Sequence, residues 1–549
     1  MTRNFLLIVT ALAAAIPAMA DTPSPPRTDW GEQVVVLETE WFRAELSNFG
    51  GTLRSFLLKG DDRYVRTEAE ADAVMEGLAA TPQLNVPRGK FSPGPLDMVT
   101  TWDWHLYPFA LRFEDTDFAE LYQKDPTYQV TEATPTSVTF VWPHPEHGVK
   151  TQFSVERRWE VDTSTPDHRH VLRATIRFRN AGEREIRGAV RLAITGFEPM
   201  PRPQGMCGGM FGPRQDHMQA ACGSNEERKL ADHLGLSVET GLLNQASFVG
   251  INSRYFLLAA VPDGMMVQCL AEADSVGVIN VYGRWQLDLR AASSAGQPGL
   301  QEFSFAAFLG PKDFDELKAM DGARETGVRR TIDFNMFGKI NLAILCEPML
   351  YFMRAVYSLI PSWAVSIILL TLVVKLLTLY WSWKSLVQAR KMQQLKPKMD
   401  AIKARYKDDN AAMQKAMMEL YKREKVNPFG GCLPMLLQMP IWIALYMTIY
   451  GSVDLFHAPL FLWVTDLSAQ DPYYVLPILL GVLMFVQQKM TPSVGDPAQA
   501  KVMLWLMPIM FTWFMLFLPS GLVFYILVNT LLSIGQQYLM NRRFAVKGA

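Results

Sequence analysis

One lysine inside an apolar run raises the sharpest chemical question in this sequence. Residues 363–381 (WAVSIILLTLVVKLLTLYW) are long enough to cross a bilayer, and Lys375 interrupts them well inside the hydrocarbon. A charged side chain at that depth costs roughly 2.5–3.5 kcal/mol on insertion-derived scales. The five long apolar runs that follow residue 361 contain no Asp or Glu, which excludes an ion pair within them. Lys375 therefore either lines a hydrated, positively charged cavity, or its long aliphatic side chain carries the ammonium group to the inner membrane–water interface.

Other side chains in these runs could share that cavity or line its walls. The candidates for a hydrophilic groove are Lys375, Thr371, Gln438, Thr512, Asn529 and Ser533. Two stripes at helical spacing consist of Met435, Met439 and Tyr446, and of Met503, Met507 and Met510. Thioether side chains repack around varied apolar partners. The residues of these stripes therefore either pack in an ordinary apolar core or form a surface along which varied apolar partner segments can slide.

The first half of the chain shows no pattern that predicts catalysis. Its histidines, which include His168 and His170, match no metal-ligand spacing, and no nucleophile elbow, HExxH or phosphate-binding loop occurs. We expect no catalytic residue, no metal and no cofactor, and predict that the protein is not an enzyme. Cys207 and Cys222 share a Gly/Met-rich loop and either pair with each other or stay unpaired, whereas Cys269 is expected to pack as a small apolar residue.

The elements that carry these residues follow from composition. Residues 1–20 have a basic start, an apolar core and a small-residue site, and are predicted to be a signal peptide or an N-terminal anchor. Residues 21–31 are a Pro-rich linker. Residues 32–334 alternate short β-branched segments with turn signals, which predicts an exported antiparallel β-sandwich.

The second half is predicted to lie in or on a membrane. Residues 337–360 place polar side chains on one helical face and predict an interfacial amphipathic helix, and residues 361–549 form the membrane core. We expect spans over residues 363–381, 432–450, 473–488, 503–518 and 522–540. Five spans result if the signal is removed, and six if it remains.

Charge sets the orientation of these spans. Residues 384–425 carry a large excess of Lys and Arg, whereas residues 453–472 carry none, and this asymmetry predicts that the basic segment is cytoplasmic. Apolar residues in the basic segment recur every three or four positions, from Met392 to Leu420, and predict a hairpin of two antiparallel helices. The basic faces of this hairpin suit either anionic lipid headgroups or ribosomal RNA. The whole chain has a formal net charge of -1, and we expect no DNA partner.

Several segments resemble a known family. Residues 424–440 (EKVNPFGGCLPMLLQMP), 458–477 (APLFLWVTDLSAQDPYYVLP) and 517–525 (FLPSGLVFY) resemble the signatures of the bacterial YidC membrane protein insertases. The similarity spans residues 337–543 and is weaker in the exported half, where residues 45–51 (ELSNFGG) carry part of it. The resemblance implies a periplasmic β-supersandwich that is mutarotase-like. It also implies a bundle of five core transmembrane helices with a cytoplasmic helical hairpin.

The resemblance also implies a function. Such a protein inserts nascent inner-membrane proteins and helps them fold, alone or with the Sec translocon, through a groove open to the cytoplasm and closed outward. Lys375 stands where this family usually has Arg. The implied partners are nascent membrane proteins, the Sec translocon, the ribosome or signal recognition machinery, and anionic lipids. The implied location is the bacterial inner membrane, with the large domain in the periplasm and the C-terminus in the cytoplasm.

Two other functions compete with this interpretation. A secondary transporter would show inverted repeats and midplane polar groups reachable from both faces, and we find no such repeat. A membrane-anchored periplasmic carbohydrate-active enzyme would need a far smaller membrane domain than residues 361–549 provide.

Overall fold

The chain folds into two compact units, and the main boundary between them falls between Ile332 and Asp333. The structure is a computed structural model. It describes residues 8–11, 31–68, 70–72, 74, 92–101, 106–114, 119–124, 126–143, 151–197, 218–232, 236, 239–273, 278–293, 297–322, 325–332, 334–336, 340–406, 409–424, 433–490 and 497–547.

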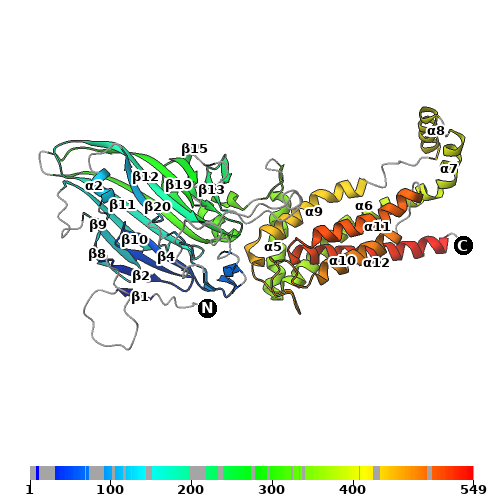
Figure 1. Ribbon diagram of the computed structural model, residues 1–549, viewed down its shortest axis with the longest axis horizontal. Coiled ribbons are helices and arrows are strands. Elements are labelled where there is room, and N and C mark those ends of the chain that lie inside the picture. Colours follow the sequence, from blue (N-terminus) through cyan, green and yellow to red (C-terminus); the bar gives the residue numbers. More distant parts are fainter. Residues whose placement is uncertain are drawn as a thin grey trace. The chain divides into compact units, whose positions relative to one another are not determined.

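The N-terminal unit is a β-sandwich of antiparallel sheets, as the sequence predicts (Figure 1). In spatial order, the largest sheet consists of β14 (Arg228–Asp232), β13 (Gln219–Gly223), β16 (Phe248–Asn252), β17 (Phe256–Pro262), β20 (Gly299–Pro311), β11 (Val171–Asn180), β10 (Phe153–Val161), β9 (Ser137–Trp142) and β8 (Gln129–Ala133). The facing sheet consists of β15 (Thr240–Ala246), β18 (Val267–Ala273), β19 (Val278–Leu289), β12 (Ile186–Phe197) and β7 (Ala110–Glu114). A third sheet consists of β1 (Ile8–Ala11), β2 (Val34–Glu38), β3 (Phe42–Ser47) and β4 (Thr52–Leu58).

Shorter elements complete this unit. They are α2 (Ala119–Lys124), α4 (Phe314–Gly322), the 3-10 helix η5 (Val328–Thr331) and the two-residue strands β5 (Val65–Arg66) and β6 (Gly94–Pro95).

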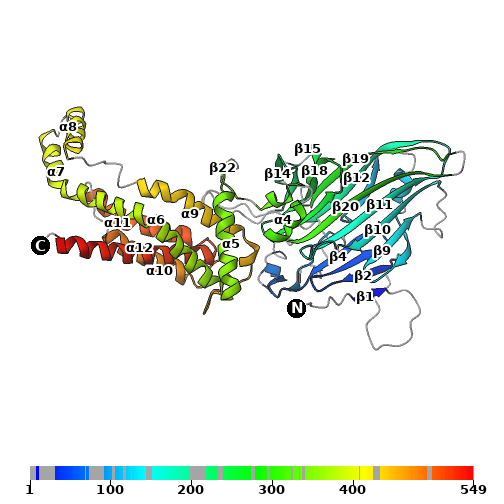
Figure 2. The same ribbon diagram turned by 180° about the vertical axis from the view of Figure 1, so that it is seen from behind.

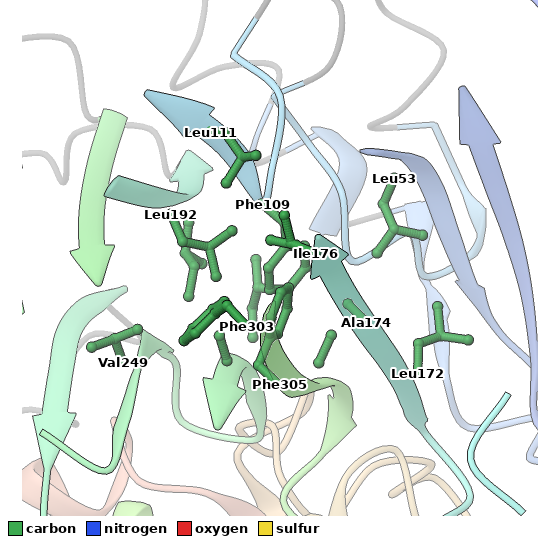
Figure 3. Packing of buried hydrophobic residues seen from close by; sticks show 14 of the residues in the cluster. Leu53, Phe109, Leu111, Leu172, Ala174, Ile176, Leu192, Val249, Phe303 and Phe305 are labelled. Atoms are coloured by element: carbon green, nitrogen blue, oxygen red, sulfur yellow. The ribbon is translucent and has the colours of Figure 1, made fainter. Parts of the chain in front are cut away.

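Alternation along the strands builds the core of the sandwich. In β10, Phe153, Val155, Arg157 and Trp159 are buried, while the residues between them are more exposed. Side chains from different sheets belong to one cluster, which includes Leu53 of β4, Leu192 of β12 and Phe305 of β20 (Figure 3). The period of two therefore places one face of each strand in a shared apolar layer.

A disulfide joins the two large sheets and corrects an expectation from the sequence. Cys222 of β13 is bonded to Cys269 of β18, 47 residues further along the chain. This bond excludes the pairing of Cys207 with Cys222, which the sequence left open, and the prediction that Cys269 is a small apolar residue without a disulfide is wrong. Cys207 itself lies outside the described residues. The reason is topological, because two distant strands that face each other across the sandwich bring their cysteines together.

The N-terminal segment differs from a simple export signal in the full-length chain. Ile8–Ala11, inside the apolar stretch of residues 1–20, forms β1 and pairs antiparallel with β2. An apolar β-branched segment can extend a sheet edge when it stays attached to the chain. The signal peptide or anchor remains a prediction.

The C-terminal unit is helical (Figure 2). Its helices are α5 (Ala343–Leu359), α6 (Trp363–Gln394), α7 (Lys396–Arg405), α8 (Asn410–Arg423), α9 (Leu433–Gly451), α10 (Val475–Met490), α11 (Pro497–Met515) and α12 (Ser520–Lys547). Small pieces are the strands β21 (Asn335–Met336) and β22 (Ile340–Asn341) and the 3-10 helix η7 (Val453–Leu455). The expected interfacial helix over residues 337–360 is α5, which begins later because β21 and β22 precede it.

The helices are arranged as a bundle with different elements at its two ends. In both views α5 runs across one end of α6 and α9–α12, whereas α7 and α8 lie at the other end (Figures 1 and 2). Among the described residues, Trp363–Lys384 and Ser520–Leu539 are long and apolar enough to cross a membrane. Met439–Gly451, Val475–Met490 and Leu504–Met515 are shorter apolar helices. Below, the end with α5 is called the outer end and the end with α7 and α8 the inner end.

The predicted seam of the basic hairpin is confirmed. Met392, Leu395, Met399 and Leu420 form a small buried cluster between the end of α6, α7 and α8. The side chain of Asp409 caps α8 by accepting hydrogen bonds from the backbone N–H groups of Ala411 and Ala412. The apolar seam thus leaves the charged residues of this hairpin on its outside.

Candidate functional site

Lys375 lies on α6 and contacts α12. Its ammonium Nζ donates a hydrogen bond to Ser533 Oγ at 2.7 Å, and Ser533 Oγ donates its own proton to the Asn529 carbonyl at 2.7 Å. The lone pairs of the hydroxyl are therefore free to face the cation. In the described part of the chain, no carboxylate forms an ion pair with Lys375. The half-buried cation is held by a neutral oxygen and keeps hydrogen-bonding capacity for another partner.

Polar residues share the face of α6 that carries Lys375. Thr371 and Thr378 stand four residues before and three residues after it, so helical geometry places all three on one face. Both threonines are buried, and their hydroxyls donate to the carbonyls of Ile367 and Val374. Each hydroxyl still has an acceptor site. The structure therefore brings Lys375, Thr371, Asn529 and Ser533 to the region where α6 packs against α12.

An apolar plug fills the bundle on the outer side of Lys375. The segment 452–474, called the outer loop, connects α9 to α10 and folds back into the helices. Its buried apolar side chains, which we call the outer plug, are Leu455, Ala458, Leu460, Val464 and Leu467. They belong to one cluster with residues of α6, including Ile367 and Leu370, and with the first turns of α12. Val374 is the last residue of α6 in this cluster, so Lys375, the next residue, lies at the inner limit of the apolar cluster.

Polar contacts fix the outer loop, and the sequence analysis did not identify them. Arg354 Nε of α5 donates to Asp454 Oδ2 at 2.8 Å, and both side chains are largely buried. Asp471 accepts hydrogen bonds from Trp463 Nε1 and from the backbone N–H of Leu476 in the first turn of α10. A possible signal was the charge pattern, because acidic residues in a segment without Lys or Arg need partners elsewhere.

The two methionine stripes lie on helices at the two ends of a packed series. Extensive contacts join α11 to α10, α10 to α12 and α12 to α6, whereas α9 packs mainly on α5 and makes fewer contacts with α6. Met439 of α9 and Met510 of α11 are exposed, Met507 is half-buried, and Tyr446 stacks on Tyr450 with 5.3 Å between ring centroids. On α9 the stripe lies opposite the face that buries Ala444, Leu445 and Thr448, because the two sets are about half a turn apart.

Thr512 lies apart from the other groove candidates. It faces Gly481 of α10, where a Cβ atom would lie only 2.1 Å from Thr512 Oγ1, and its hydroxyl donates to the Pro508 carbonyl. A shallow apolar cavity between α10 and α11 has Thr512 in its lining. Thr512 therefore occupies the side of α11 opposite its methionines, and no described contact joins it to Lys375. The side chains of Gln438, Met435 and Met503 lie outside the described residues.

The histidines of the sandwich that the structure describes have carboxylate partners. His168 Nδ1 lies 3.1 Å from Asp162 Oδ2, and the buried His170 Nδ1 lies 2.9 Å from Glu316 Oε2. Among the residues that the structure describes, no three His, Cys, Asp or Glu side chains come together to hold a metal ion. His170 is therefore a buried residue whose ring is held by a carboxylate, and it does not lie on the surface.

Known proteins resemble both the whole chain and its parts. A family model described as "60Kd inner membrane protein" matches residues 355–547. The membrane protein insertase YidC of Anaeromyxobacter sp. (strain K) is 33% identical over 515 residues, covering 93% of this chain and 85% of that protein. A crystal structure of an active YidC insertase covers 92% of both chains, with 17% identity and a TM-score of 0.37. A galactose mutarotase related enzyme from Lactobacillus acidophilus covers 51% of this chain and 97% of its own, with 11% identity and a TM-score of 0.29.

Proposed function

The chain belongs to the YidC family of membrane protein insertases, and we propose that it uses Lys375 to receive nascent membrane proteins from the cytoplasm. The protein is a membrane protein insertase of the bacterial inner membrane. We further propose that the β-sandwich lies in the periplasm, that the C-terminus lies in the cytoplasm, and that the protein works alone or beside the Sec translocon.

The observation that carries the proposal is the state of Lys375. It is a half-buried cation at the inner limit of the apolar cluster, bound to a neutral hydroxyl of Ser533. A cation that lacks a carboxylate partner attracts acidic residues, and the attraction strengthens where water is partly excluded. An acidic residue in the short tail or loop of a client would thus find a favourable position part way across the bilayer. The outer plug would stop the tail from crossing before the rest of the client is in place.

The client's apolar segment would leave by another route. It would slide between α9 and α11, the helices at the two ends of the packed series, along Met435, Met439, Tyr446, Met503, Met507 and Met510. Thioethers accommodate apolar side chains of different shapes. Burial of apolar surface in lipid would drive the step, aided for charged tails by the membrane potential. Gln438 and Thr512 remain proposed groove residues, although the placement of Thr512 against Gly481 favours a role in packing.

The hairpin of α7 and α8 offers a cytoplasmic contact surface. Its apolar seam is buried, while Lys398, Arg405, Lys415 and Lys422 are exposed. We propose that these cations meet anionic headgroups or phosphates of the ribosome or signal recognition machinery, since both partners present negative charge. Raising the salt concentration should weaken either contact.

A charge-reversal experiment tests the role of Lys375. In membrane vesicles, Lys375→Glu should reduce insertion of a client with an acidic tail at least about tenfold, because charges about 4 Å apart interact by roughly 4 kcal/mol at an effective dielectric of about 20. Lys375→Arg should retain insertion. Lys384→Glu is the matched control, because Lys384 is an exposed lysine further along the same helix.

A second client separates charge from general damage. The same client with its acidic tail residues changed to Asn and Gln should insert equally well with Lys375 and with Lys375→Glu. Equal insertion of the acidic client by both proteins would refute the proposed role of the charge.

A further inference from the structure

The carboxylates of the outer loop are largely withdrawn from solvent, because Asp471 is 2% exposed and the side chains of Asp454 and Asp466 are 15% and 21% exposed. Asp454 is bonded to Arg354, Asp466 accepts the backbone N–H and hydroxyl of Ser468 at 2.7 Å, and Asp471 accepts Trp463 Nε1. Residues 453–472 contain no Lys or Arg. The outward surface of this segment is consequently almost free of charge.

The same loop turns large apolar side chains outward. The exposed fractions are 42% for Phe461, 82% for Leu462, 68% for Tyr473 and 44% for Tyr474. We call these four residues the aromatic rim. They combine aliphatic, aromatic and phenolic groups, the composition that proteins place at a membrane–water interface.

The backbone conformation of Leu462, at the tip of the rim, argues against exposure of this side chain to water. Phe461 and Val464 form a β-bridge, and Leu462 at the turn between them has φ 53°. A branched aliphatic residue in the left-handed region costs free energy that Gly or Asn would avoid. The turn therefore presents a leucine outward at a conformational cost, and that leucine gains nothing unless an apolar medium covers it.

We propose that the aromatic rim inserts into the headgroup–acyl boundary of the outer leaflet and thereby holds the outer plug in the bundle. The rim belongs to the loop whose other face supplies Leu455, Leu460 and Val464 to the plug, so one short segment links the seal to the lipid. An uncharged rim avoids both the cost of burying charge and repulsion from anionic headgroups. The inference rests on the proposed function only for the orientation of the bundle.

Lipid explains this surface better than a second protein does. The rim has four members, and the carboxylates that could provide specific polar contacts already have partners in α5, in α10 or in the loop itself. A specific protein interface needs a larger matched surface with satisfied hydrogen bonds. Insertion into the headgroup–acyl boundary of a leaflet needs only apolar side chains together with tyrosine rings whose hydroxyl groups stay near water.

Depth measurements on the full-length chain test the proposal. In a background with Cys207→Ser, Cys346→Ala and Cys432→Ser, Leu462→Cys is labelled with an environment-sensitive fluorophore and reconstituted in vesicles of phosphatidylethanolamine and phosphatidylglycerol. Thr465→Cys is the matched control, because Thr465 is an exposed polar residue just after the turn. Nitroxide lipids should quench the label at 462 at least about threefold more than the label at 465, and aqueous iodide should show the reverse order.

The results distinguish a rim that is covered by lipid from one that is covered by water or by a partner protein. Equal access of iodide to both labels in vesicles would overturn the proposal. Protection at 462 in native membranes but not in vesicles would also overturn it, because a protein partner would then cover the rim.

A second variant excludes a simple folding defect. Leu462→Gly suits the positive φ and should keep the turn folded, yet it should make a label at Tyr473→Cys shallower by removing the tip of the rim. An unchanged depth at 473 would contradict the anchoring role. None of these measurements uses a client protein, so the rim can succeed or fail separately from the insertion assay on Lys375.

Discussion

Each unit contains a cation that is at least partly buried, Arg157 in the sandwich and Lys375 in the helical unit, and the two are held differently. Arg157 of β10 is 1% exposed, and its guanidinium donates to the carbonyls of Gly50 at 2.7 Å and Phe109 at 2.8 Å. Burial lowers the pKa of Arg157, and electrostatic interaction with the nearby Tyr128 and Tyr122 offsets part of that effect. Lys375 is only half-buried and binds one serine hydroxyl.

The difference separates a structural cation from one that can bind a client. The planar guanidinium of Arg157 donates to backbone carbonyls of two separate segments, at Gly50 and Phe109, so it ties those segments to the sheet. Lys375 has a flexible stem, a single neutral partner and a position at the edge of the apolar cluster. A cation surrounded by rigid acceptors contributes to folding, whereas one with unused hydrogen-bonding capacity can contribute to binding.

The largest expected effect concerns the fixed cation. Arg157→Met should lower the free energy of unfolding of the β-sandwich by roughly 5 kcal/mol, because each buried acceptor left unpaired costs about 1–3 kcal/mol and the mutation leaves at least two. Urea denaturation of the purified chain, followed by protease resistance of the sandwich, measures the change. Lys375→Met is the comparison and should leave this transition unchanged. A sandwich that tolerates Arg157→Met would remove the contrast between the two cations.

The covalent link between the sheets should have the next largest effect. Cys222→Ala or Cys269→Ala should reduce the stability of the sandwich by about 4 kcal/mol, the loop-closure entropy of a crosslink spanning 47 residues. The double variant should resemble either single variant, because both remove the same bond. Additive losses in the double variant would instead indicate that each cysteine acts through packing alone.

The helical unit has no such bond among its described residues and depends on an ion pair at its outer end. Arg354→Ala should destabilise the outer loop by roughly 2 kcal/mol, between the values for exposed and fully buried pairs. Asp454→Ala should do the same, and exchanging the two residues in Arg354→Asp/Asp454→Arg should restore part of the loss. Protease cleavage within the outer loop reports the effect. A swapped variant no better than Arg354→Ala would show that the pair has no electrostatic role.

The smallest effect is expected for the partner of Lys375. Ser533→Ala should lower insertion of an acidic-tailed client by less than about fivefold, equivalent to about 1 kcal/mol, because water can replace a single neutral hydroxyl. Ser533→Thr keeps the hydroxyl and is the matched control. A loss from Ser533→Ala as large as that from Lys375→Glu would mean that the hydroxyl is indispensable for holding the cation.

Periodic patterns in the sequence predicted much of the architecture. The strands of the sandwich, the apolar helices and the seam around Met399 follow from local alternation and helical spacing, and the structure has them. The orientation of Thr512 could also have been inferred, because its helical position is about half a turn from Met510. That spacing separates it from the methionine stripe before any tertiary contact is known.

Contacts between distant segments could not be predicted in the same way. Cys222 meets Cys269 because β13 and β18 face each other, and Arg354 meets Asp454 although 100 residues separate them. The outer plug is a further example, since a connecting loop normally runs over the surface. No local period encodes which segments fold back into a core.

By itself the sequence determined that a lysine lies within an apolar helix without an acidic neighbour in any other apolar run, because composition and hydropathy are local properties. Only the tertiary structure decided that Lys375 contacts Ser533 of α12 and that a loop seals the bundle on its outer side. These arrangements depend on how whole helices pack, and that packing depends on the shapes of many side chains acting together.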